Sequence, residues 1–100
     1  MIFVINPSNP CGSVFSKEHM LEIADFVRTS QIVLLADEIY EELAYEENDT
    51  FYHFAEVAPD IPIIKAGGLS KVFCVPGWRL GWAIVYNRDG ALTEVLQGMV

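Results

Sequence analysis

The sequence predicts an α/β fold in which a mostly parallel sheet is flanked by helices. Three apolar runs, at residues 1–6, 32–38 and 61–67, are predicted as strands, and the first shows no polar alternation, which is typical of strands buried in parallel sheets. A helical pattern separates the first two runs, and strand, helix and strand in this order make a βαβ unit. The hydrophobic fraction of 52% lies slightly above the usual range of about 45 to 50%. These observations predict a packed core and argue against disorder.

The helix between the first two strands is predicted from its cap and its apolar stripe. Ser16 is an N-cap residue and precedes a helix that runs to about Thr29. The residues that form the i, i+3, i+4, i+7 stripe are Met20, Ile23, Ala24 and Val27. We expect this stripe to pack on the sheet. A second, short helix is expected at residues 54–58.

The fourth strand, residues 80–86, is expected to run antiparallel to the third. Only residues 67–79 separate the two strands, and this stretch contains Pro76-Gly77 and no good amphipathic helix. A parallel crossover usually contains a helix, and this stretch predicts none. A new helix is expected to begin at Ala91.

The formal net charge of -8 argues against nucleic acids and anionic membranes as partners, because both need a basic footprint. The opening apolar run of five residues is too short for a signal peptide or a membrane span, so a cytoplasmic location is expected. Cys11 and Cys74 form neither a disulfide framework nor a CxxC metal pattern, so two reduced thiols and no metal site are expected.

One hundred residues allow at most one domain. Met1 stands directly at a core strand and Val100 within the last helix, whereas chain ends are usually polar and at the surface. We therefore expect residues 1–100 to be part of a larger domain that continues on both sides.

Polar side chains follow three successive strands of the predicted sheet. Asn9 follows the first strand, Asp37 and Tyr40 the second, and Ser70 and Lys71 the third. Ligands of open α/β sheets bind at the carboxyl ends of the strands, so this convergence predicts a site. Each residue also has a structural interpretation when taken alone: Asn9 as a turn residue, Asp37 as a helix cap and Tyr40 as a core residue.

Lys71 and Arg79 are unusual because their neighbours are apolar. Those neighbours are Val72, Phe73, Val75, Trp78, Leu80 and Trp82. A lysine in an apolar pocket is pushed toward its nucleophilic form, and arginine grips phosphate through its planar fork. A ligand with an aldehyde, a phosphate and a ring nitrogen for Asp37 would satisfy these groups, and pyridoxal phosphate has all three. The acidic residues Glu41, Glu42, Glu46, Glu47 and Asp49 are interpreted as a solvated face.

At three places the residues resemble a known family. The stretches are "NPSNPCG", "ADEIY" and "GGLSKVFCVPGWRLGW". In their order and spacing they resemble the class I aminotransferases of fold type I, and among these most closely the tyrosine aminotransferases. The resemblance covers roughly residues 3 to 90 and implies that this chain is the central part of the large, cofactor-binding domain.

The resemblance also implies roles for the candidate site residues. Lys71 matches the lysine that bonds to the cofactor aldehyde and moves a proton to and from the substrate α-carbon. Asp37 matches the aspartate that pairs with the protonated pyridine nitrogen, and so keeps the ring an electron sink. Tyr40 and Asn9 match the donors to the phenolic oxygen of the cofactor, and Arg79 matches the arginine that binds the phosphate.

One position departs from the pattern of many relatives. These have a serine three residues before the lysine, and here that residue is Gly68. Phosphate binding is therefore expected to depend on Arg79, Ser70 and backbone N–H groups.

The resemblance implies amino-group transfer from an L-amino acid, with tyrosine favoured, to a 2-oxo acid such as 2-oxoglutarate, in a homodimer. Two alternatives stay open. The first is another pyridoxal-phosphate reaction, as in carbon–sulfur lyases, aminocyclopropane carboxylate synthases, or alanine and kynurenine aminotransferases. The second is a non-catalytic α/β module whose contact surface is the acidic loop at residues 46–49. The family's substrate-binding arginine, phosphate loop and ring-stacking aromatic residue fall outside the matched stretch, so the isolated chain is expected to turn over little or nothing.

Overall fold

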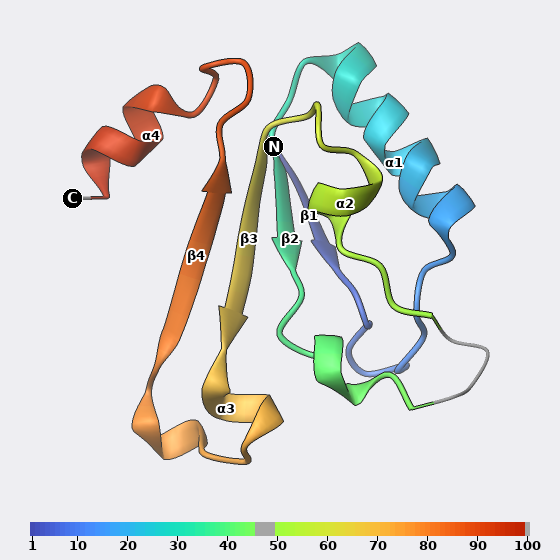
Figure 1. Cartoon of the computed structure of the whole chain (residues 1–100), viewed down its shortest axis with the longest axis vertical. Helices are drawn as coiled ribbons and strands as arrows, with labels where there is room; N and C mark the ends of the chain where they lie inside the picture. The colour runs from blue at the N-terminus through green and yellow to red at the C-terminus, as the bar shows by residue number, and fades with distance from the viewer. Residues whose placement is uncertain (46–49, 100) are drawn as a thin grey trace.

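Four strands form one sheet in the order β1-β2-β3-β4. The computed structural model describes residues 1–45 and 50–99. The strands are β1 (Ile2–Ile5), β2 (Leu34–Asp37), β3 (Ile63–Gly68) and β4 (Gly81–Tyr86). Strands β1, β2 and β3 pair in parallel, and β4 pairs with β3 in the antiparallel sense (Figure 1). The predicted α/β class and the antiparallel last strand are both confirmed.

The helices follow the predicted order. They are α1 (Lys17–Ser30), η1 (Glu41–Leu43), α2 (Phe54–Val57), α3 (Leu69–Val72), η2 (Pro76–Trp78) and α4 (Thr93–Gly98). Helix α1 begins as predicted, because the Ser16 hydroxyl accepts a hydrogen bond from the backbone N–H of His19 at 3.2 Å. The connection between β3 and β4 differs from expectation, since it contains the one-turn helix α3. None of the described helices is long and apolar enough to cross a membrane.

The core lies between one face of the sheet and the helices α1 and α2. It contains Val4, Met20, Ala24, Val27, Leu34, Ala36, Phe54, Ala58, Ile61 and Ile63. The predicted apolar stripe of α1 is confirmed, with Ile23 packed at the margin of the cluster. The expectation that the first strand is buried on both faces is wrong. Its side chains alternate between the two faces of the sheet, and Phe3, on the face opposite to Val4, is 54% exposed.

The parallel register brings the ends of three strands to one edge. Ile5 pairs with Asp37 and Asp37 pairs with Ala66, so β1, β2 and β3 end side by side. The loop after β1, the helix η1 and the helix α3 therefore lie at the same end of the molecule, at the bottom of Figure 1. This edge carries the residues from which the candidate site is built.

Candidate functional site

Three of the predicted residues lie next to one another at this edge. The Asn9 side-chain amide donates a hydrogen bond to the Tyr40 hydroxyl at 3.3 Å. The Lys71 ammonium lies 5.3 Å from the centre of the Tyr40 ring, within the range of a cation–π contact. Asn9 comes from the loop after β1, Tyr40 from the start of η1 and Lys71 from α3. Three separate segments of the chain thus meet at Tyr40.

Asp37 is the last residue of β2 and lies half-buried at the same edge. Because side chains alternate along a strand, it lies on the face opposite to the buried Ala36. One carboxylate oxygen accepts a hydrogen bond from the backbone N–H of Ile39 at 3.2 Å. The carboxylate therefore stabilises the turn into η1, in agreement with the structural interpretation of this residue.

Ser70 and Arg79 line a common hollow of about 200 Å³ together with Gly68. Arg79 adopts a left-handed conformation with φ of 51°, which is uncommon for a residue with a side chain. It follows η2, and its guanidinium donates a hydrogen bond to the carbonyl of Pro76 at 3.1 Å. A side chain at Gly68 would place its Cβ only 3.1 Å from the carbonyl oxygen of Leu80. Glycine at this position suits the close approach of β4.

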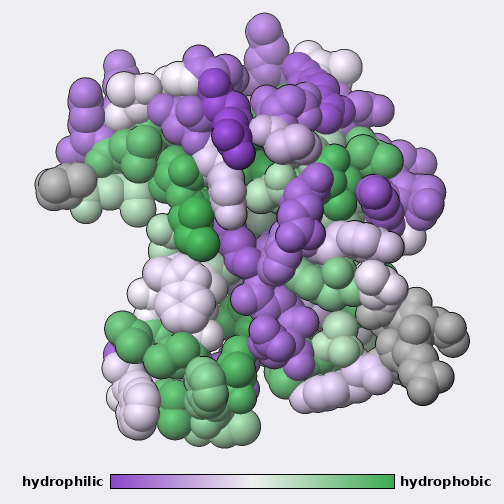
Figure 2. Space-filling view, viewed as in Figure 1, coloured by the Kyte–Doolittle hydropathy of each residue, from purple (hydrophilic) through white to green (hydrophobic). Residues whose placement is uncertain are grey.

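The expectation that apolar neighbours bury Lys71 and Arg79 is wrong for the described chain. Both side chains are exposed. Their neighbours are exposed with them, including Phe73 at 63% and Trp78 at 71%. Figure 2 shows hydrophobic side chains gathered at the end of the molecule that α3 and η2 form. The apolar residues of this segment make an exposed surface rather than a pocket around the two cations.

The predicted residues are gathered at one edge, yet they are not all in contact. Among residues 1–45 and 50–99, no hydrogen bond or ion pair joins Asp37 or Arg79 to Lys71. A larger hollow of about 360 Å³ lies at the other end of the sheet, beside Arg28 and Asp60. Those two side chains are bonded to each other at 2.6 Å, so we place the site at the strand ends, where polar groups converge.

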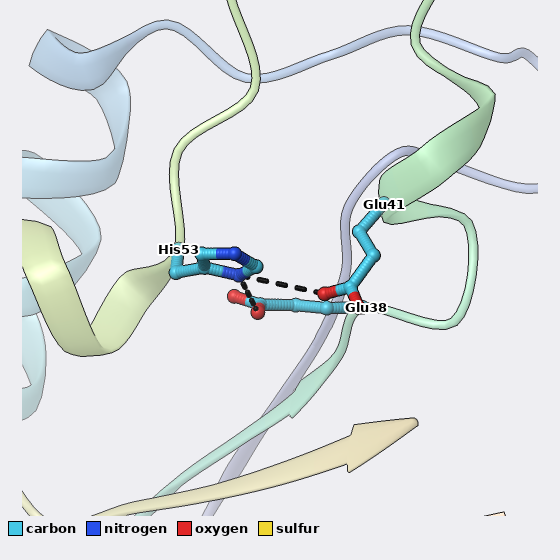
Figure 3. A group of neighbouring side chains, drawn as sticks. All are labelled: Glu38, Glu41 and His53. Atoms are coloured by element: carbon cyan, nitrogen blue, oxygen red, sulfur yellow. Dashed lines mark hydrogen bonds and ion pairs between the residues drawn. The ribbon is translucent and has the colours of Figure 1, made fainter. Parts of the chain in front are cut away.

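A second group of charged residues lies beneath this edge, and the sequence reasoning missed it. Glu38 is 1% exposed and follows directly after β2. One of its oxygens accepts the backbone N–H of Phe54 at 2.9 Å, and the other lies 2.8 Å from His53 Nδ1. Lys65 Nζ lies 3.2 Å from that second oxygen and 2.6 Å from Glu41. Figure 3 shows Glu38, Glu41 and His53 directed toward one another.

The same three residues could hold a metal ion by their spacing alone, since their ligand atoms lie within 4.8 Å of one another. The Lys65 ammonium already provides the positive charge between the two carboxylates. Burial lowers the pKa of the Lys65 ammonium, but the hydrogen bond to Glu41 and the charge of Glu38 outweigh this effect, so the pKa is raised above its ordinary value. We therefore interpret the group as an ion-pair cluster, which we call the Lys65 cluster: Glu38, Glu41, His53 and Lys65.

This cluster corrects the prediction for one of the acidic residues. Glu41 is not a solvated residue, because its side chain is 23% exposed and paired with Lys65. Glu42 is exposed, as predicted, while Glu46, Glu47 and Asp49 lie outside the described residues. One signal was present in the sequence: Lys65 stands within an apolar strand, where a charge needs a partner.

Comparison with known proteins identifies the family. The family model "Aminotransferase class I and II" matches residues 1–100. The chain belongs to the aminotransferase class I and II family. It is 48% identical over 99 residues to a tyrosine aminotransferase from Caenorhabditis elegans, covering 99% of this chain and 21% of that protein. It is 36% identical over 98 residues to an S-alkyl-thiohydroximate lyase from Arabidopsis thaliana, covering 96% of this chain and 21% of that protein.

The fold agrees with solved structures of this family. The crystal structure of tyrosine aminotransferase from Leishmania infantum superimposes with a TM-score of 0.90 and 39% sequence identity, covering 97% of this chain and 24% of that chain. The predicted resemblance to fold type I aminotransferases is confirmed. The chain spans about a fifth of the length of the curated aminotransferase-family relatives that it matches.

The Lys65 cluster predicts a pH dependence of stability. Because the pKa of Lys65 is raised on folding, its contribution is complete below the ordinary value of 10.5 and is lost as pH rises through the higher value of the folded protein. Lys65→Met would remove the positive charge that lies between the carboxylates of Glu38 and Glu41, at a cost of about 3 to 5 kcal/mol.

This prediction is checked by thermal unfolding of the wild-type and Lys65→Met proteins between neutral pH and strongly alkaline pH. The difference in melting temperature should be constant near neutral pH and should shrink above pH 10.5. Lys17→Met is the matched control, because Lys17 is an exposed lysine outside the cluster. A difference that stays constant into the strongly alkaline range would contradict the account.

Proposed function

We propose that this chain is the cofactor-lysine segment of the large domain of an aminotransferase that uses pyridoxal phosphate. The single observation that carries the proposal is the meeting of three loops at Tyr40. There the Asn9 amide lies 3.3 Å from the Tyr40 hydroxyl, and the Lys71 ammonium lies 5.3 Å from the Tyr40 ring. The proposal is also supported because the chain belongs to the aminotransferase class I and II family.

The residues at the edge suit the chemical groups of pyridoxal phosphate. An amine suits an aldehyde, and the amine of Lys71 is exposed at the strand ends. A guanidinium and a hydroxyl suit a phosphate, and Arg79 and Ser70 share one hollow. A carboxylate suits a protonated ring nitrogen, and Asp37 ends β2 at the same edge. When bound, pyridoxal phosphate supplies an electrophilic carbonyl carbon and a ring that accepts negative charge.

Lys71 has two tasks in this proposal. Its amine would hold the cofactor, because a primary amine suits an aldehyde, and as a free amine it would serve as a base at the same place. There its nitrogen would take a proton from the substrate α-carbon and would give a proton back later in the amino transfer. Its exposure at the edge leaves room for a substrate to enter.

The neighbours of Lys71 prepare this chemistry. Tyr40 and Asn9 would donate hydrogen bonds to the phenolic oxygen of the bound cofactor. The Asp37 carboxylate would keep a proton on its ring nitrogen, which would let the ring accept negative charge. Arg79 and Ser70 would hold the phosphate and so orient the cofactor toward Lys71.

The substrates that we propose are an L-amino acid, with tyrosine favoured, and a 2-oxo acid such as 2-oxoglutarate. The preference for tyrosine is supported by the identity to the Caenorhabditis elegans tyrosine aminotransferase. We also propose that the complete enzyme is a homodimer, as the resemblance to fold type I aminotransferases implies.

Borohydride reduction tests the role of Lys71. The full-length protein that carries these residues is mixed with pyridoxal phosphate, reduced and digested, and the modified peptide is mapped by mass spectrometry. We expect the label on Lys71. The two other lysines of this chain, Lys17 and Lys65, serve as internal controls, and a label on either of them in place of Lys71 would refute the assignment.

Asp37→Asn tests the electron-sink role in the same protein. The substitution keeps the shape of the side chain and the acceptor for the Ile39 N–H, and removes the charge that holds the ring proton. We expect borohydride labelling of Lys71 to persist, while the turnover number falls about 100- to 1,000-fold. Asp89→Asn, an exposed aspartate away from the edge, is the control. Normal turnover of the Asp37→Asn enzyme would overturn this role.

A second candidate function is a lyase reaction with the same cofactor. It is favoured by the 36% identity to the S-alkyl-thiohydroximate lyase from Arabidopsis thaliana, because the cofactor-binding residues alone do not select the bond that is cleaved. Product analysis separates the two candidates. A 2-oxo acid formed from tyrosine together with glutamate from 2-oxoglutarate supports the transferase, and ammonia and pyruvate released from a cysteine conjugate support the lyase.

A further inference from the structure

Tyr40 stands between two carboxylates that are tied to other parts of the chain. Glu38 and Glu41 flank it in sequence, and the backbone N–H of Glu41 donates to the carbonyl of Glu38 at 3.0 Å, which closes the turn. Glu41 is paired with Lys65 of β3 at 2.6 Å. Glu38 is bonded to His53 and to the start of α2. Both ends of the turn are therefore held from the core side.

The hydrogen bond from Asn9 to the Tyr40 hydroxyl is weaker than the Lys65–Glu41 ion pair. The Asn9 contact to the Tyr40 hydroxyl measures 3.3 Å, which is longer than the usual range for N–H···O bonds of about 2.7 to 3.2 Å. The Lys65–Glu41 contact is short and joins two opposite charges with little exposure, 11% for Lys65 and 23% for Glu41. The position of Tyr40 therefore depends more on the Lys65 cluster than on Asn9.

Donor groups from several elements face the two carboxylates of the cluster. His53 Nδ1 lies 2.8 Å from a carboxylate oxygen of Glu38 and 3.1 Å from Lys65 Nζ. Lys65 Nζ donates to Glu41 at 2.6 Å and forms an ion pair with the same Glu38 oxygen at 3.2 Å. The backbone N–H of Phe54 donates to the other Glu38 oxygen at 2.9 Å. Each carboxylate thus receives at least one charge-assisted hydrogen bond, and the two anions can lie close together.

We infer that the Glu41–Lys65 pair, supported by Glu38 and His53, is a positioning device that holds the Tyr40 ring over Lys71. Lys65 and Lys71 lie six positions apart on one continuous segment, β3 followed by α3. The pair therefore ties the turn that carries Tyr40 to the segment that carries the reactive amine. The significance of this device for catalysis rests on the proposed function, whereas the geometry that it maintains can be measured without cofactor.

The test is the rate at which an acylating reagent modifies Lys71. The full-length protein is treated, free of cofactor and at pH 8, with sulfo-N-hydroxysuccinimide acetate, and acetylation of each lysine is followed by peptide mass spectrometry. Glu41→Ala releases the pair without stranding the more deeply buried Glu38, which keeps Lys65. Because the ring then no longer covers and stabilises the ammonium, acetylation of Lys71 should rise about two- to five-fold, as expected for the loss of an exposed cation–π contact.

Matched variants separate positioning from a general loss of structure. Glu42→Ala, at the exposed neighbouring glutamate, should leave the rate at Lys71 unchanged. Tyr40→Ala should raise it as much as Glu41→Ala does, and the double variant should add nothing, because both changes remove one contact. Glu41→Gln keeps an acceptor for Lys65 and should restore most of the protection. Lys17 in each sample is the internal reference.

Three results would overturn the inference. In the first, Glu41→Ala matches Glu42→Ala at Lys71. In the second, the effects of Glu41→Ala and Tyr40→Ala add in the double variant. In the third, Lys17 acetylation rises together with that of Lys71, which would show a general loosening of the chain. A failure of borohydride labelling at Lys71 would remove the cofactor role and leave these acetylation results unaffected, so the two proposals fail separately.

Discussion

The parallel pairing of β1, β2 and β3 is the constraint on which the rest of the structure depends. Its register places Ile5, Asp37 and Ala66 in one row across the sheet, so the three following segments begin at a single edge. A shift by one residue would move Asp37 to the core face and would turn Lys65 away from its carboxylate partners. The candidate site and the Lys65 cluster are consequences of the same register, on opposite sides of the strand ends.

The two charged groups at this edge differ in burial, and this difference suits different tasks. Lys65 is enclosed by two carboxylates and a histidine, and its charge is fully used inside the molecule. The Lys71 side chain is exposed, and its ammonium contacts the Tyr40 ring. One lysine thus maintains the shape of the edge while the other stays available for a ligand. Six positions of sequence separate the paired Lys65 from the exposed Lys71, the lysine that we propose to react.

Much of the fold follows from local patterns. Ser16 and the stripe of Met20, Ala24 and Val27 predict α1 because capping and the helical period act within a few residues. The short connection before β4 predicts its direction for a similar reason. The pairing of Glu41 with Lys65 spans 24 positions, so no local pattern reveals it, and Glu41 resembles an ordinary surface residue in sequence. The exposure of Phe73 and Trp78 was missed because apolar neighbours in sequence were taken as neighbours in a pocket.

A crystal structure of the full-length protein grown with pyridoxal phosphate tests the central claim most directly, namely that the three strand ends supply one cofactor site. The account predicts continuous electron density from Lys71 Nζ to the aldehyde carbon. It also predicts the Asp37 carboxylate at the ring nitrogen, Tyr40 and Asn9 at the phenolic oxygen, and Arg79 with Ser70 at the phosphate. Cofactor density bound to another lysine, or bound away from the ends of β1, β2 and β3, would contradict it.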